Sequence, residues 1–425
     1  MSENDQVFAK SARILIPFIA LLYFINYVDR VNLSFAALTM NQDLGFTPSV
    51  YGRGAGIFFF GYLLFQIPAN AVLVRLGARR WIFSIMLVWG VLSMATAFVQ
   101  TPLSFYTVRF LLGIAEAGFF PGMVLYLTYW FPQGYRARLI AGFMIAIPLA
   151  FVLGAPLSGL LLQLDGALSL HGWQWLFLTE GLPAFVLSFV VIKFLPDGPS
   201  DAPWLSSEEK SEISSRLRSE ASTLTQEFWP ALLDPRVWAL GLIYFGINFG
   251  RYGVEFWLPQ IVRGVGFSIL ATTFVVAVPY GLGMLAMVYW GRLSDVKRER
   301  IWHVALPSLT AATGCAVSAA TQNDVAVLLS LFAVVISLLA VQGPFFSLPS
   351  TYLAGSAAAG GIALVNTLGT GMGGYLGPLI IGELKERSGT YGSSMAVLAV
   401  GLLLSCLIAL GLGRATRARA TALEG

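Results

Sequence analysis

Long apolar runs alternate with short polar segments along most of the chain. Most runs are close to the roughly 20 residues that an α-helix needs to cross the hydrocarbon core of a membrane. One run is longer than a span, so it must tilt, kink or project beyond the membrane. The pattern predicts an all-α membrane protein with twelve transmembrane helices, over residues 13–36, 51–74, 81–99, 102–129, 137–162, 173–195, 237–262, 270–291, 302–320, 325–347, 352–382 and 391–413.

A polar stretch separates the first six runs from the last six. Its serines precede acidic residues, a pattern that predicts a short amphipathic helix capped by Ser206 or Ser207. We therefore expect an N-terminal six-helix bundle (1–195), a linker (196–236) and a C-terminal six-helix bundle (237–425).

The two predicted bundles also resemble each other. One constant shift along the chain places Trp81 on Trp302, each after a basic loop, and the same shift places Arg30 on Arg251. Secondary transporters are commonly built from such repeats, with their binding site near the bilayer midplane between the halves.

The distribution of basic residues predicts an orientation. Of the 26 Lys and Arg residues, about nineteen lie in the loops on one side of the predicted membrane, three lie inside spans, and the other side holds only Arg53, Arg263, Lys385 and Arg387. The positive-inside rule then places the linker and both termini in the cytoplasm. The first apolar run has no small-residue cleavage site, so we expect a retained span in the inner (plasma) membrane.

Composition narrows the class of protein. The chain has 57% hydrophobic and only 11% charged residues, against roughly 25% charged in a soluble domain. The net charge of +4 comes from short loops and does not indicate a nucleic-acid partner. Two Cys and two His, far apart in the sequence, predict no disulfide, metal site or cofactor. An enzyme and a channel are both disfavoured, because the reactive residues are scattered and the spans carry a single charged layer.

Six ionisable residues fall well inside the spans. Each charge costs about 2.5–3.5 kcal/mol at the centre of a membrane helix, so such residues usually face the bundle interior and mark a substrate or ion route. At 1.5 Å per residue, Arg30 and Arg109 are expected at similar depth in the outer half of the membrane. The six residues are Asp29, Arg30, Arg109, Glu116, Arg251 and Glu255.

Two interpretations of this layer are open. In the functional one, Arg30 and Arg251 hold an anionic substrate, because a guanidinium grips a carboxylate with two donors. Glu116, with Asp29 as second candidate, then carries the coupling proton. In the structural one, the charges only join helices: Arg251 with Glu255 four residues later, and Arg109 with Glu116 on one helical face.

Several uncharged polar residues also fall at inner positions of the spans. We expect them to contribute to a substrate site or to bond helices together. They are Tyr27, Tyr62, Asn248, Tyr280 and Asn366. Glu180, near the outer part of the sixth span, is expected to serve packing.

Several motifs resemble one transporter family. They are INYVDR (25–30), GYLLFQIP (61–68), RFLLGIAEAGFFPG (109–122), GWQWLFLTEGLPA (172–184), YGVEFWLPQ (252–260) and GIALVNTLGTGMGGYLGP (361–378). In this order they resemble the anion:cation symporters of the major facilitator superfamily, including bacterial tartrate, phthalate and sugar-acid permeases. The resemblance implies the major facilitator fold, alternating access and proton-coupled uptake of organic anions.

The resemblance also implies residue roles. Asp29 and Glu116 match the family's protonatable carboxylates, while Arg30 and Arg109 match its arginines of spans 1 and 4. Tyr27, Tyr62 and Asn366 match polar positions of the cavity.

The loops differ from the superfamily pattern in one place. Arg75 and Arg79 lie in the gating loop after span 2, where Val74 replaces the usual acid, whereas the loop after span 8 keeps its acid as Asp295.

The sequence therefore predicts a monomeric symporter whose partners are a proton, a small organic anion and membrane lipid. Arg251 resembles an arginine of carriers for doubly charged anions, which favours a dicarboxylate such as tartrate or phthalate. An organic anion antiporter, or a symporter for a monocarboxylate or sugar acid, is the alternative.

Overall fold

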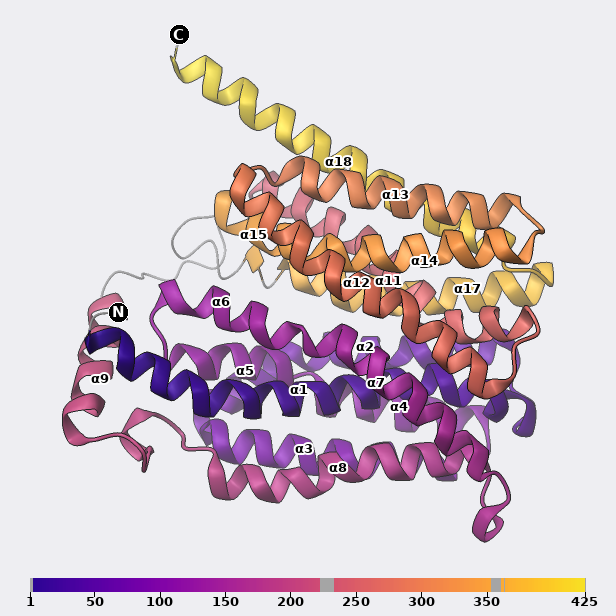
Figure 1. The fold of residues 1–425 in the computed structure, drawn as a ribbon, viewed down its shortest axis with the longest axis horizontal. Coiled ribbons are helices and arrows are strands. Elements are labelled where there is room, and N and C mark those ends of the chain that lie inside the picture. The colour runs from indigo at the N-terminus through magenta and orange to yellow at the C-terminus, as the bar shows by residue number, and fades with distance from the viewer. Residues whose placement is uncertain (1–2, 222–232, 353–360, 363, 425) are drawn as a thin grey trace.

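The computed structural model describes residues 3–221, 233–352, 361–362 and 364–424. Within these residues the secondary structure is helical, as predicted, and most of the helices lie roughly along one direction (Figure 1). Eight of the described helical segments are long and apolar enough to cross a membrane by length and composition. Parts of the predicted linker (222–232) and of the predicted span 352–382 (353–360 and 363) lie outside the described residues.

The N-terminal part contains the first six predicted spans. Its helices are α1 (Glu3–Asp43), α2 (Pro48–Leu76), α3 (Ala78–Ala95) with η1 (Thr96–Phe98), α4 (Pro102–Glu116), α5 (Phe119–Thr128), α6 (Gln133–Met144), α7 (Ala146–Leu161) with η2 (Leu162–Leu164), η3 (Ala167–Ser169) and α8 (Gly172–Phe194). Helix α3 packs on α8, α2 on α4, and α1 on α7 and α8.

The C-terminal part contains the other six. Its helices are α11 (Pro235–Gly264), α12 (Ile269–Lys297), α13 (Ile301–Ala320), α14 (Asp324–Ala340), α15 (Gln342–Tyr352), η5 (Thr367–Gly373), α17 (Gly374–Ser388) and α18 (Gly392–Glu424). Helix α18 packs on α13 and α11, and α12 packs on α14.

Local sequence explains where these helices begin. The Thr101 side chain accepts from the backbone N–H of Ser104, and the Ser104 hydroxyl accepts from the backbone N–H of Thr101. Pro102 follows at the first helical position. Ser268 and Asn323 cap α12 and α14 with their side-chain oxygens. Such caps satisfy backbone donors that have no partner within the helix.

Three spans predicted as continuous are broken in the structure. The span at 102–129 breaks between α4 and α5, directly after Glu116, and 137–162 breaks at Ile145. The span at 325–347 breaks at Val341. In the last part of 352–382, η5 is a π-helical segment, a feature often found at functional sites.

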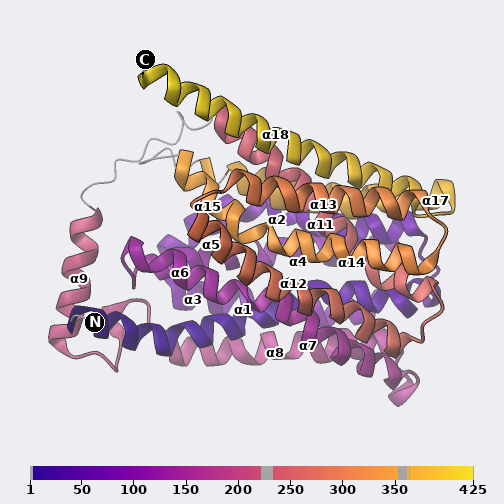
Figure 2. The same ribbon diagram turned by 45° about the horizontal axis from the view of Figure 1, so that its top comes forward.

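The predicted linker forms the elements η4 (Pro199–Asp201) and α9 (Ser207–Ala221). Ser206 and Glu209 form the predicted cap: Glu209 accepts from the Ser206 backbone N–H at 2.8 Å, and its own N–H donates to the Ser206 hydroxyl. Helix α9 lies at the end of the molecule where α1 begins and α18 ends, and Lys10 reaches Glu209 at 2.9 Å (Figure 2).

The two parts meet mainly where α2 packs on α17 and η5, α7 on α12, and α1 on α11. Helices α2 and α17 approach most closely at glycines, since a Cβ on Gly52 would lie 2.6 Å from the Pro378 carbonyl oxygen. Only a residue without a side chain permits this backbone contact.

Polar contacts reinforce this interface at the end away from α9. Arg53 lies 2.6 Å from Glu383, which also accepts from the Ser49 hydroxyl at 2.5 Å. Glu386 accepts from the Thr47 hydroxyl and the Ser49 backbone N–H at 2.7 and 2.8 Å. We call Thr47, Ser49, Arg53, Glu383 and Glu386 the outer cluster.

Candidate functional site

The six charges predicted within the spans are all buried, with exposed fractions between 0% and 8%. Four come from α1 and α4 in the N-terminal part and two from α11 in the C-terminal part. The two parts therefore meet at a charged layer inside the bundle, which we call the central layer.

The carboxylate of Glu116 contacts two side chains of α1. Its Oε2 lies 2.9 Å from the Arg30 guanidinium and accepts from the Asn26 amide, also at 2.9 Å. Oε1 has no hydrogen-bond partner among the described residues. Glu116 can therefore take a proton on one oxygen while the other holds α1 and α4 together.

The prediction that Arg109 pairs with Glu116 is wrong in this structure. Helical spacing put the two side chains on one face, but Arg30 from the neighbouring helix lies closer to the carboxylate. Arg109 is fully buried, its guanidinium stands 4.9 Å from the Phe58 ring centroid, and its three nitrogens lack hydrogen-bond partners among the described residues. A buried cation in this position attracts anions.

Asp29 faces α3 rather than the arginines. Its Oδ1 accepts from the Ser93 hydroxyl and, at 3.0 Å, from the Asn32 amide. Its Oδ2 has no partner among the described residues. No described hydrogen bond or ion pair joins Asp29 to the Arg30–Glu116 pair, although it is the next residue to Arg30.

Arg251 makes the predicted contact within α11 and a second contact with α1. The predicted pair within α11 is present, since Arg251 Nε lies 3.3 Å from Glu255 Oε2. The guanidinium also donates to the Tyr27 hydroxyl across the interface between α1 and α11.

Tyr27 lies between the two cations. The guanidinium carbons of Arg30 and Arg251 stand 5.5 and 5.7 Å from its ring centroid. The ring of Tyr62 is 5.5 Å from the Arg30 guanidinium, and that of Tyr252 is 5.2 Å from the Arg251 guanidinium. Aromatic faces attract cations, so these rings hold the two guanidinium groups in place without neutralising them.

The remaining predicted polar residues lie on other contacts. Tyr280 of α12 stacks on Phe151 of α7, with centroids 3.6 Å apart. Asn248 donates to the backbone carbonyl of Tyr244 in its own helix at 3.1 Å, and Asn366 accepts from the Thr370 hydroxyl within the π-helical region at 2.9 Å. Their place in a substrate site stays a prediction.

Sequence reasoning missed four residues of the central layer: Asn26, Asn32, Ser93 and Tyr252. Asn26 stands one helical turn before Arg30, so the shared face of α1 could have indicated it. Nothing in the sequence shows which residue of another helix faces Asp29.

The residues of the predicted gating loops make contacts with acidic side chains, and their gating role stays a prediction. Asp197, at the start of the predicted linker, accepts from the Arg79 backbone N–H at 2.9 Å, and its carboxylate lies 3.6 Å from the Arg79 guanidinium. Arg75 is exposed in the last turn of α2. In the other part, Asp295 pairs with Arg300 at 2.6 Å.

The described residues hold no group of three or more His, Cys, Asp and Glu side chains that could bind a metal ion. In the central layer, buried guanidinium groups can attract anions and buried carboxyl groups can exchange protons.

Comparison with known proteins identifies close relatives. The sequence profile of the Major Facilitator Superfamily matches residues 19–378. A protein of Agrobacterium vitis named "Putative tartrate transporter" is 46% identical over 405 residues, which cover 95% of this chain and 90% of that protein. A quinolone resistance transporter of Acinetobacter baumannii is 38% identical, covering 93% of this chain and 92% of its own length.

The fold has close neighbours among solved structures. A bacterial homologue of the human lysosomal transporter Spinster, solved in an inward-facing conformation, superposes with a TM-score of 0.76. The match covers 95% of this chain and 97% of that one at 17% sequence identity.

Proposed function

Because the chain belongs to the major facilitator superfamily of membrane transporters, we propose that it imports an organic carboxylate together with protons. The substrate of this proposal is a dicarboxylate such as tartrate, taken up across the plasma membrane by a monomer whose two termini are cytoplasmic. The observation that carries it is the meeting of Arg30 and Arg251 at Tyr27, at the interface of the two parts.

Proton binding and anion binding are linked at Arg30. While Glu116 is ionised, its carboxylate occupies the Arg30 guanidinium at 2.9 Å. Protonation removes that charge, and Arg30 is then available to a carboxylate of the substrate. A guanidinium remains charged throughout, so the proton on Glu116 controls anion affinity without changing the arginine.

Two cations favour two negative charges on the substrate. Arg251 offers the second guanidinium, held by Tyr27 and by the carboxylate of Glu255 3.3 Å away. A dicarboxylate binding both arginines draws α1 and α11 together. The guanidinium of Arg109 lacks a hydrogen-bond partner among the described residues, and both it and that of Arg30 face the Phe58 ring. Arg109 therefore adds positive potential close to Arg30.

Alternating access then follows from the movement of residues 1–195 against 237–425. The outer cluster ties the parts at one end, which our proposal assigns to the extracellular side. Substrate and proton leave toward the end where α9 lies, and the empty carrier returns once Glu116 pairs again with Arg30.

An antiporter for organic anions is the second candidate, because guanidinium groups at the interface also suit exchange. Buried Asp29 and Glu116 favour proton coupling, since exchange of anions does not require protonatable groups. The quinolone resistance relative widens the range of substrates to compare, as quinolones are amphipathic carboxylic acids.

The proposal is tested with purified protein in liposomes that contain a pH-sensitive dye. Tartrate added outside should acidify the lumen in the absence of any imposed gradient, because protons enter with the anion. Arg30→Ala should abolish the signal, while Glu208→Gln in the exposed linker should not. Tartrate entry without a change in luminal pH contradicts symport, and entry that requires internal tartrate identifies an antiporter.

A further inference from the structure

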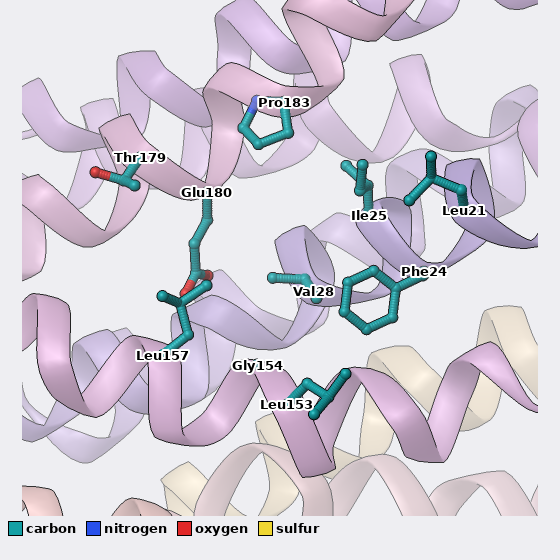
Figure 3. Close-up of a pocket in the computed structure, with 10 residues that line it drawn as sticks. All are labelled: Leu21, Phe24, Ile25, Val28, Leu153, Gly154, Leu157, Thr179, Glu180 and Pro183. Carbon is teal, nitrogen blue, oxygen red and sulfur yellow. The ribbon is translucent and has the colours of Figure 1, made fainter.

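A cavity lies at the perimeter of the N-terminal part, between α1, α7 and α8 (Figure 3). Its volume is about 250 Å³, and its lining is largely apolar, with Phe24 and Val28 from α1 and Pro183 from α8. Leu153 and Leu157 of α7 line it while being 54% and 44% exposed. The cavity thus opens toward the surface that faces lipid in a membrane protein.

One acidic side chain points into this apolar cavity. Figure 3 shows Glu180 extending from α8 toward Leu157 and Gly154 on α7. Glu180 is only 3% exposed; its Oε1 accepts from the Ser158 hydroxyl at 2.7 Å, and its Oε2 has no partner among the described residues. A buried acceptor without a partner costs free energy unless a ligand supplies a donor.

No described ion pair joins Glu180 to a cationic side chain. The ionisable group that influences it is Asp29, another acid, and the described ion pairs of Arg30 and Arg251 are made with Glu116 and Glu255. An ionised carboxylate in an apolar region of the membrane favours a cation beside it. The cavity therefore has an apolar body and an acidic group at its base, and an ionised Glu180 would complement an apolar molecule with one positive group.

We propose that this cavity binds a lipophilic amine that enters from the lipid phase. The ammonium group donates to Glu180 Oε2, and the apolar body fills the space lined by Phe24, Val28 and Leu157. This site differs from the proposed substrate site in charge, since the central layer attracts anions. A molecule with a hydroxyl in place of the ammonium can donate one hydrogen bond but does not neutralise the carboxylate.

The test uses the full-length protein in phosphatidylcholine nanodiscs and an alkylamine that carries a photoreactive diazirine. We expect labelling of the segments 21–28, 153–157 and 179–183 that saturates and is competed by unlabelled dodecylamine. An alkyl alcohol with the same diazirine should label these segments at least fivefold less. Glu180→Gln keeps the size and the acceptor oxygen but removes the charge, so amine labelling should fall at least fivefold, to the level of the alcohol.

Two further variants complete the test. Glu208→Gln makes the same charge change in the exposed linker and should label like the wild type. Leu157→Trp fills the cavity while Glu180 remains, and it should abolish labelling by both probes. If Glu180→Gln does not fold, the result with Leu157→Trp tests the proposal in its place. Equal labelling by amine and alcohol, insensitivity to Glu180→Gln, or unchanged labelling of Leu157→Trp would overturn the proposal.

Discussion

Tyr27 connects the two halves of the proposed site through two different interactions. Its hydroxyl accepts from Arg251, and its ring faces both Arg251 and Arg30. The ring attraction contributes about 0.5–1 kcal/mol at exposed sites and about 2 kcal/mol when desolvated. The hydroxyl contact is of similar size, because a hydrogen bond to a charged group contributes about 1.5–3 kcal/mol.

Tyr27→Phe separates these contributions, since it keeps the ring and removes the acceptor. We expect an apparent KM for tartrate about tenfold higher, because Arg251 loses the contact that positions it, with expression and thermal stability close to wild type. Tyr27→Ala removes the ring as well and should cost more. Uptake kinetics in liposomes measure both variants; identical kinetics for Phe and wild type would show that the hydroxyl has no positioning role.

Arg251 decides between a dicarboxylate and a monocarboxylate. Saturating ligand stabilises a protein by about 2.7 kcal/mol at a concentration one hundred times its Kd. In a thermal-shift series, dicarboxylates should therefore raise the unfolding temperature of the wild type, and Arg251→Ala should lose that response. Arg263→Ala, an exposed arginine in the last turn of the same helix, is the matched control. Equal responses to monocarboxylates in wild type and Arg251→Ala would assign Arg251 to its structural pair with Glu255.

At the scale of single residues, the sequence predicts which residues lie inside the spans better than it predicts which of them contact each other. Hydropathy alone places the six charges inside spans, because an ionisable side chain interrupts an apolar run visibly. Which acid meets which arginine depends on how each helix is rotated against its neighbour. Arg109 and Glu116 share a face of one span, yet Arg30 of another helix takes the carboxylate. The contacts of Ser93 with Asp29 and of Asp197 with Arg79 are long-range for the same reason.

At the scale of the helix, breaks and close approaches provide the means for movement. Helix α4 ends at Glu116 and α5 begins at Phe119, so the proposed proton-binding carboxylate stands at a break in its span. The sequence predicted this span as continuous, because the apolar run continues on both sides of Glu116. Helices α2 and α17 are held together at Gly52 and by the outer cluster beside it.

The outer cluster predicts a pH dependence. Glu383 lies just beyond the predicted span, and the Ser49 hydroxyl and the Arg53 guanidinium hold its pKa below its usual range. A carboxylate with a lowered pKa stabilises the closed contact above its ordinary pKa, and this stabilisation is lost as the pH falls through the lowered value. Acidification below the usual range of a glutamate should therefore favour separation of α2 and α17.

This effect is measured as the distance between spin labels on exposed Leu103 and Thr390, at neutral and at acidic pH. Glu383→Gln at neutral pH should reproduce the longer distances that acid produces in the wild type. Glu208→Gln, in the linker, should leave the distances unchanged. Closed distances at every pH in Glu383→Gln would show that the cluster does not hold this end together.

At the scale of the whole molecule, the all-α fold and the superfamily follow directly from the sequence. Twelve apolar runs separated by a polar linker, and motifs in a fixed order, are enough to predict them. The linker does more than connect, however, because Asp197 at its start supplies the acid that Val74 does not provide in the gating loop. The predicted boundaries at 195 and 237 stay a prediction about which residues move as one unit.

The account of transport as a whole depends on Glu116 as the proton switch of Arg30. Uphill uptake requires Glu116 to release its proton inside and pair again with Arg30 before the empty carrier returns. Exchange of internal for external anion does not require that step. Glu116→Gln resembles the protonated state permanently, so it should separate the two activities.

The most direct measurement compares wild type and Glu116→Gln in liposomes, in tartrate accumulation driven by a pH gradient and in exchange of labelled for unlabelled tartrate. The account predicts that the variant loses accumulation at least a hundredfold and retains exchange within about tenfold of wild type. Gradient-driven accumulation in the variant would contradict Glu116 as the proton carrier. Loss of both activities in a folded protein would assign Glu116 to binding or structure instead.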